Sequence, residues 1–137
     1  MKTIVLGYDG SEQSDRALAR AGDLATAFGS TVVVVSVAPL MSGGAHGGGS
    51  VDPTDPPEVH DVLLDGARGR LADRGLTAEV ALGLGAPADA IVQLAEERAA
   101  ELIVVGTREP GLMERLLGLS VSESVQRRAH CDVLIVH

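Results

Sequence analysis

Two hydroxyl side chains, Ser120 and Ser122, stand at the start of a predicted helix, after a strand and a long loop. The run Ser-Val-Ser-Glu that ends at Glu123 is typical of a capping box, in which the serine and the glutamate satisfy each other's backbone donors. A helix N-terminus offers unpaired amides and about half a positive charge, so it can bind an anion such as a phosphate. Capping alone also explains Ser120, and both interpretations stay open.

The elements that would position these hydroxyls follow from the hydrophobic pattern. Short apolar runs alternate with segments of helical period, which start after Ser11, near Asp55, at Pro87 and at Ser120. The apolar runs predict strands over residues 4–6, 31–37, 102–105 and 133–136, and alternation of apolar and polar residues predicts a half-exposed edge strand over 78–82. This alternation requires a parallel sheet with helices on both faces, because parallel strands need long, right-handed crossovers. We therefore predict a single α/β domain over residues 1–137, with a doubly wound five-stranded parallel sheet.

The crevice of such a sheet is the expected place for a ligand. In open α/β sheets, ligands bind beyond the carboxyl ends of the strands, where the strand order reverses. That rule places residues 7–9, 37–38 and 106–111 around one crevice.

The segment after the second strand reads differently. Six of the seven residues 43–49 are Gly or Ala, so we predict that residues 39–55 form a flexible insert without regular structure. Asp55 is expected to cap the helix that follows. His46 and His60 are expected in a solvated, mobile segment rather than at a metal site. The buried face of the helix is expected to carry Val59, Leu63, Ala67 and Leu71.

Composition excludes several classes of function. The chain has 11 Lys and Arg against 19 Asp and Glu, and its net charge of −8 repels nucleic-acid backbones and anionic lipid. Aromatic residues make up 1% of the chain, which excludes a protein that stacks bases on aromatic side chains. The sole lysine is Lys2, so neither a Walker phosphate loop nor a Schiff-base enzyme is available. The longest apolar run, 32–35, is too short to span a membrane, and we expect a soluble, cytoplasmic protein.

Several stretches resemble the universal stress protein family over nearly the whole chain. They comprise Val5 to Ser11, Gly85-Ala86-Pro87, Leu102 to Gly106, Ser120 to Val125 and Ala129 to Val136. The resemblance implies the sheet order 3-2-1-4-5, a homodimer, and membership in either an ATP-binding or a non-binding subclass.

The last strand gives a separate reason to expect the homodimer. Its residues Val133, Leu134, Ile135 and Val136 do not alternate with polar ones, although the strand lies at a sheet edge in this topology. An uncovered apolar edge invites uncontrolled pairing. The same strand of a second copy, related by a two-fold axis, would cover it.

The resemblance also implies site residues for a nucleotide. Asp9 matches the family's adenine-side aspartate, although an Asp before Gly10 is equally typical of a tight turn. Val37 matches the residue that packs on adenine, or is plain core. Arg108 contacts a phosphate or pairs with a neighbouring carboxylate. The remaining expected site residues are Gly7, Tyr8, Val105, Gly106, Glu109, Leu119, Ser120, Val121 and Ser122.

The phosphate loop departs from the family pattern. ATP-binding members resemble Gly, two residues, Gly, nine residues, Gly, then Ser or Thr, whereas Glu109 and Leu119 stand here where two of those glycines are expected. The carboxylate would repel a triphosphate by about 1 kcal/mol or more. The leucine would strain a backbone with positive φ by roughly 1–2 kcal/mol.

Two functions remain open from the sequence. The first is an adenine-nucleotide site that binds ATP weakly, with Mg only if ATP is bound, or a less charged nucleotide such as AMP or cyclic AMP. The second is a dimer that binds no nucleotide and acts by contacting other proteins. We expect no enzymatic activity, because the crevice offers no lysine and no obvious base, and Asp9 alone would have to hold a metal.

Overall fold

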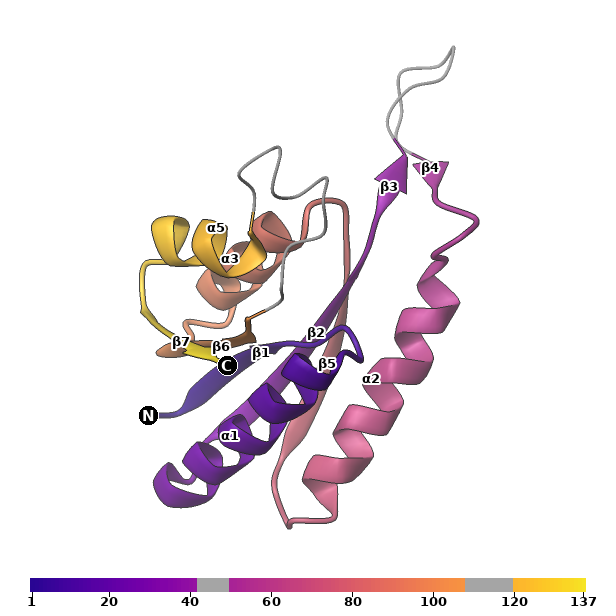
Figure 1. The fold of residues 1–137 in the computed structure, drawn as a ribbon. Helices are drawn as coiled ribbons and strands as arrows, with labels where there is room; N and C mark the ends of the chain where they lie inside the picture. Colours follow the sequence, from indigo (N-terminus) through magenta and orange to yellow (C-terminus); the bar gives the residue numbers. More distant parts are fainter. Residues whose placement is uncertain (42–49, 108–119) are drawn as a thin grey trace.

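A computed structural model describes residues 1–41, 50–107 and 120–137. Its centre is a parallel sheet in the order β5-β2-β1-β6-β7, which confirms the expected α/β fold and the order 3-2-1-4-5 (Figure 1). The strands are β1 (Thr3–Gly7), β2 (Thr31–Ala38), β5 (Ala78–Leu84), β6 (Leu102–Gly106) and β7 (Asp132–Val136). β5 and β7 form the two edges, as the alternating pattern of residues 78–82 predicts for β5 and the topology predicts for β7.

Helices cover both faces of the sheet. They are α1 (Glu12–Phe28), α2 (Pro57–Ala72), α3 (Pro87–Glu97) and α5 (Val121–Arg128). Figure 1 shows α1 and α2 on one side of the sheet and α3 and α5 on the other. Successive strand residues face opposite sides, so Ile4 and Leu6 pack in the core beneath α1 and α2, whereas Val5 packs in the core beneath α3 and α5. Within the described ranges, no helix has the length and apolar character that crossing a membrane requires.

Local signals set the two ends of α1. Ser11 is the N-cap, and its hydroxyl accepts a hydrogen bond from the Ser14 amide at 3.2 Å. Gly29 ends the helix in the left-handed conformation, with φ of 66°. The start after Ser11 agrees with the prediction, and both ends depend on residues that are adjacent in the chain.

The prediction that no element forms over 39–55 is wrong at the two ends of that segment. β3 (Leu40–Met41) and β4 (Ser50–Val51) pair as a short antiparallel ladder, in which Leu40 faces Val51. Figure 1 shows this pair beyond the end of β2. The prediction depended on the glycines in the middle of the segment, and glycine content there does not indicate whether the apolar residues on either side pair.

The register of α2 also differs from the prediction. The helix begins at Pro57, and its N-cap Pro56 makes no side-chain cap, so Asp55 is not the capping residue. The buried positions are His60, Leu64, Ala67 and Leu71. Val59, which was expected inside, is 49% exposed. His60, and not Val59, occupies this buried position because both ring nitrogens of His60 have polar partners.

A hydrogen-bond network joins α1, α2 and the end of β1 on the α1 face. The Tyr8 hydroxyl donates to Asp15 Oδ1 at 2.6 Å, and Arg70 Nη1 donates to the same oxygen at 2.8 Å. These two hydrogen bonds hold the pKa of the Asp15 carboxyl below its ordinary value of 3.8, and the bond from Tyr8 has the larger effect. The pKa of the Tyr8 hydroxyl is raised, mainly by burial and to a smaller extent by the hydrogen bond to Asp15.

The lowered pKa of Asp15 predicts a change in acid stability. A carboxyl whose pKa is lower in the folded state contributes stability above its unfolded value, near pH 3.8, and loses it as pH falls through the folded value. Asp15→Asn should therefore flatten the pH dependence of the unfolding free energy below about pH 4. Urea denaturation at a series of pH values measures this, with the exposed Asp65→Asn as control. Equal slopes for Asp15→Asn and wild type would contradict the prediction.

Candidate functional site

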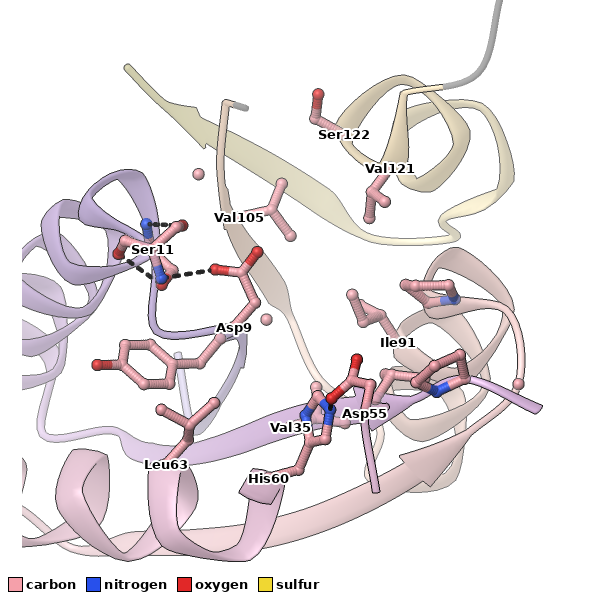
Figure 2. Close-up of a pocket in the computed structure, with 18 of the residues that line it drawn as sticks. Asp9, Ser11, Val35, Asp55, His60, Leu63, Ile91, Val105, Val121 and Ser122 are labelled. Carbon is pink, nitrogen blue, oxygen red and sulfur yellow. Dashed lines mark hydrogen bonds and ion pairs between the residues drawn. The ribbon is translucent and has the colours of Figure 1, made fainter. Parts of the chain in front are cut away.

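A cleft of about 400 Å³ opens at the carboxyl ends of β1, β2 and β6 (Figure 2). From β1 the chain continues to β2 on one side, while β6 lies on the other side of β1, so the strand order reverses at this point. That is the place where open α/β sheets bind ligands. The volume falls within the range of about 300–1,000 Å³ that is usual for small-molecule sites.

Most of the expected site residues come together in this cleft. Its walls include Gly7, Tyr8, Asp9, Val37, Val105, Gly106, Ser120, Val121 and Ser122. Arg108, Glu109 and Leu119 lie outside the described residues. The expected contribution of residues 37–38 is confirmed for Val37, whereas Ala38 is fully buried.

The N-terminus of α5 forms one side of the cleft. The Ser120 hydroxyl accepts a hydrogen bond from the Glu123 amide at 3.3 Å, which confirms its capping role. Ser120 Oγ also lies 2.9 Å from Ser122 Oγ, and Ser122 is buried. The two hydroxyls and the first amides of α5 therefore stand together beside the cleft. This set of donors fits an anionic group.

Gly106 lets two elements approach each other closely at the centre of the cleft. A Cβ atom at this position would lie 2.7 Å from both the carbonyl carbon and the carbonyl oxygen of Gln13. Those atoms belong to the first turn of α1, so they cannot rotate out of the way as a side chain can. The absence of a side chain at Gly106 thus fixes how near α1 lies to the end of β6.

Asp9 forms the predicted turn and also lies at the cleft. Its Oδ1 accepts a hydrogen bond from the Ser11 amide at 2.9 Å and forms a turn through Gly10, where φ is 80°. The same side chain lines the cleft. Figure 2 shows its carboxylate between the start of α1 and Val105. The turn is confirmed, and the turn is also what directs the carboxylate into the cleft.

Buried hydrogen bonds link Ser36, His60 and Asp55 at the cleft wall, and the sequence did not predict them. Ser36 Oγ lies 2.6 Å from His60 Nδ1, and His60 Nε2 lies 2.7 Å from Asp55 Oδ1. His60 is 6% exposed, so the expectation of a solvated histidine is wrong. His60 and Asp55 both line the cleft. Burial of the imidazole is possible because each ring nitrogen has a hydrogen-bond partner.

The remaining cleft residues were not predicted. They are Ser11, Ser14, Val35, Pro39, Val59, Leu63, Gly85, Pro87 and Ile91. Pro39 follows β2, and Gly85 follows β5, so applying the strand-end rule to every strand would have found these two. Leu63 and Val59 belong to α2, and their position depends on how that helix packs. No local signal in the sequence gives that packing.

Comparison with known proteins agrees with the fold. The model of the family described as the universal stress protein family matches residues 1–137. A universal stress protein of Mycobacterium tuberculosis is 37% identical over 142 residues, which cover 99% of this chain and 96% of that protein. A universal stress protein of Methanocaldococcus jannaschii is 34% identical over 138 residues, which cover 98% of this chain and 81% of that protein.

Two solved structures resemble the chain over nearly their whole length. A universal stress protein in complex with cAMP is 36% identical, with a TM-score of 0.76, and the match covers 99% of this chain and 96% of that one. A universal stress protein from Archaeoglobus fulgidus in complex with dAMP is 25% identical, with a TM-score of 0.74 and coverage of 100% and 98%.

Proposed function

The chain belongs to the universal stress protein family, and we propose that it binds an adenine nucleotide with a single phosphate group, AMP or cyclic AMP, in the cleft. One observation carries the proposal. The cleft combines a serine-capped helix N-terminus on one side with apolar walls and carboxylates elsewhere. A nucleotide has the matching groups, namely a phosphate, a flat apolar base and several hydrogen-bond donors.

The two ends of the nucleotide would meet different residues. The phosphate would accept hydrogen bonds from the hydroxyls of Ser120 and Ser122 and from the first amides of α5. The base would pack among the apolar side chains of the wall, which include Val37, Ile91 and Val105. Asp9 would accept a hydrogen bond from the nucleoside.

Relatives with known ligands support the choice of an adenine nucleotide. The solved structure at 36% identity holds cAMP, and the one at 25% identity holds dAMP. Each of these ligands has an adenine base and one phosphate group. The likeness extends over almost the entire chain in both cases, so the cleft is part of the region compared.

The sequence of the phosphate loop favours one phosphate over three. Glu109 places a carboxylate in the segment that follows β6, where the family's ATP-binding members have a glycine. Its repulsion of a triphosphate amounts to about 1 kcal/mol or more, or about a five-fold loss of affinity. ATP should therefore bind more weakly than AMP.

Titration calorimetry on the purified protein tests the proposal. AMP and cyclic AMP should each bind with measurable heat, and the dissociation constant for ATP should be at least about five-fold higher than that for AMP. Mass spectrometry of small molecules released from freshly purified protein provides a second measurement. Absence of heat with millimolar AMP and cyclic AMP, together with no nucleotide in the released material, would contradict the proposal.

We propose binding rather than catalysis, and a homodimer through Val133, Leu134, Ile135 and Val136 of β7. The position of β7 at the sheet edge supports the dimer, since its half-buried apolar residues need a partner. Glu109 and Leu119 favour a second candidate function, a dimer that binds no nucleotide and contacts other proteins. Recovery of a bound nucleotide would exclude that second function.

A further inference from the structure

The cleft has a second carboxylate, on Asp55, which a buried hydrogen-bond chain holds in place. Ser36 is 1% exposed and His60 is 6% exposed, so water does not compete for the bonds within this chain. The side chain of Asp55 is 44% exposed and lies at the outer end of the chain, where it lines the cleft. The chain thus connects the interior of β2 to a polar group on the cleft wall.

The chemistry of Ser36, His60 and Asp55 determines which atom donates in each of their two hydrogen bonds. An ionised carboxylate only accepts hydrogen bonds, so His60 Nε2 carries the hydrogen that it shares with Asp55 Oδ1. In the neutral imidazole, Nδ1 then accepts the hydrogen of the Ser36 hydroxyl. His60 therefore occupies one oxygen of Asp55. Figure 2 shows the other oxygen directed away from the His60 ring.

The backbone of Asp55 is also held in position. Its amide donates to the Asp52 carbonyl oxygen at 3.2 Å, which closes a turn before α2. The two residues that follow are prolines, and a residue before proline is restricted to extended conformations. The orientation of Asp55 is consequently set from both the backbone and the side chain, as a residue that recognises a ligand requires.

The position of Asp55 determines which part of a nucleotide it would meet. Figure 2 shows Asp55 and His60 across the cleft from Ser122 at the start of α5. If the phosphate lies at α5, the opposite end of the nucleotide, its base, lies beside Asp55 and Val35. A carboxylate oxygen there accepts a hydrogen bond from an exocyclic amino group and repels a carbonyl oxygen.

We propose that Asp55 is a specificity-determining residue, which accepts a hydrogen bond from the amino group of the base, and that His60 is its positioning residue. This inference rests on the proposed nucleotide site and adds the basis of its choice between bases. The amino group of adenine has two hydrogens, so a bond to Asp55 is compatible with one to Asp9. Hypoxanthine, with a carbonyl in place of the amino group, should be rejected.

Titration calorimetry with AMP and IMP tests the inference, because these nucleotides differ at the group that Asp55 would contact. Wild-type protein should bind AMP about ten-fold or more tightly than IMP, as expected for a hydrogen bond to a charged group. Asp55→Asn can keep its oxygen toward the His60 N–H and present its amide N–H to the ligand. The preference should therefore invert, with weaker AMP binding and stronger IMP binding.

Two further variants separate recognition from structure. Asp61→Asn removes the same charge from an exposed residue beside His60 that does not line the cleft, and it should keep the wild-type AMP-to-IMP ratio. His60→Phe removes the bond to Asp55 and should lower the ratio toward one. If that variant does not fold, wild type and Asp55→Asn still decide the question.

The outcomes distinguish this inference from the proposed function. Equal affinity of wild type for AMP and IMP, or an unchanged ratio in Asp55→Asn, would overturn the role of Asp55 and leave the nucleotide site standing. Failure of wild type to bind AMP and cyclic AMP at all would overturn both.

Discussion

Gly106→Ala is expected to lower the free energy of unfolding by about 1–3 kcal/mol, the usual cost of overpacking. The added Cβ would lie 2.7 Å from two backbone atoms of Gln13 and 3.0 Å from its Cβ. Either α1 or the end of β6 must move to make room. Since both segments line the cleft, the variant should also bind AMP more weakly. Urea denaturation measures the first effect, and titration calorimetry measures the second.

Gly66→Ala is the matched control for this substitution. Gly66 lies within α2, and a Cβ there would meet nothing within 4 Å. Alanine is the better helix former, so this variant should gain about 0.5–1 kcal/mol of stability and keep its affinity for AMP. If the urea midpoint of Gly106→Ala equals that of wild type, the close approach of α1 to β6 does not constrain the fold as described.

The second large effect is expected from the buried chain of Ser36, His60 and Asp55. Ser36→Ala leaves His60 Nδ1 without its donor, and a buried polar atom that loses its partner costs about 1–3 kcal/mol. His60→Leu strands the Ser36 hydroxyl in the same way and also releases Asp55. The double variant removes both buried partners, so its loss of stability should be smaller than the sum of the two single losses.

Urea denaturation of the four proteins in this cycle measures the coupling. We expect a coupling energy of about 1 kcal/mol or more between Ser36 and His60. Ser14→Ala offers a comparison, because Ser14 is also buried but its hydroxyl donates to the backbone carbonyl oxygen of Ser11, the N-cap of α1. Strict additivity of Ser36→Ala and His60→Leu would show that the bond at 2.6 Å contributes nothing to stability.

The sequence predicted those parts of the molecule that depend on neighbouring residues. The ends of α1 follow from Ser11 and Gly29, whose side-chain hydroxyl and positive φ act within one turn of the helix. Four of the sheet strands could be predicted because buried parallel strands have nearly continuous apolar runs, and β5 could be predicted from its alternation of apolar and polar residues. The crevice followed in turn from the strand ends, and Asp9 and Ser120 were placed in it correctly.

Apart from the N-cap of α2, which is Pro56 and not Asp55, the errors involve partners that are distant in the sequence. His60 was expected in solvent because nothing near it in the chain indicates that Ser36, 24 residues earlier, would meet its ring. The buried face of α2 was consequently assigned to Val59 instead of His60. Likewise, Leu40 pairs with Val51 across a glycine-rich stretch that by itself favours no strand. Pairing of this kind depends on the assembled fold.

The two walls of the cleft belong to different halves of the sheet. β2, β5 and α2 lie on one side of β1, whereas β6, β7 and α5 lie on the other, and direct strand pairing joins the halves through β1 alone. A ligand that bonds to Asp55 on one side and to Ser122 on the other would link the two halves of the sheet non-covalently. Such a molecule would bind the folded chain and not the unfolded one, so its cellular concentration would also set how long the protein survives.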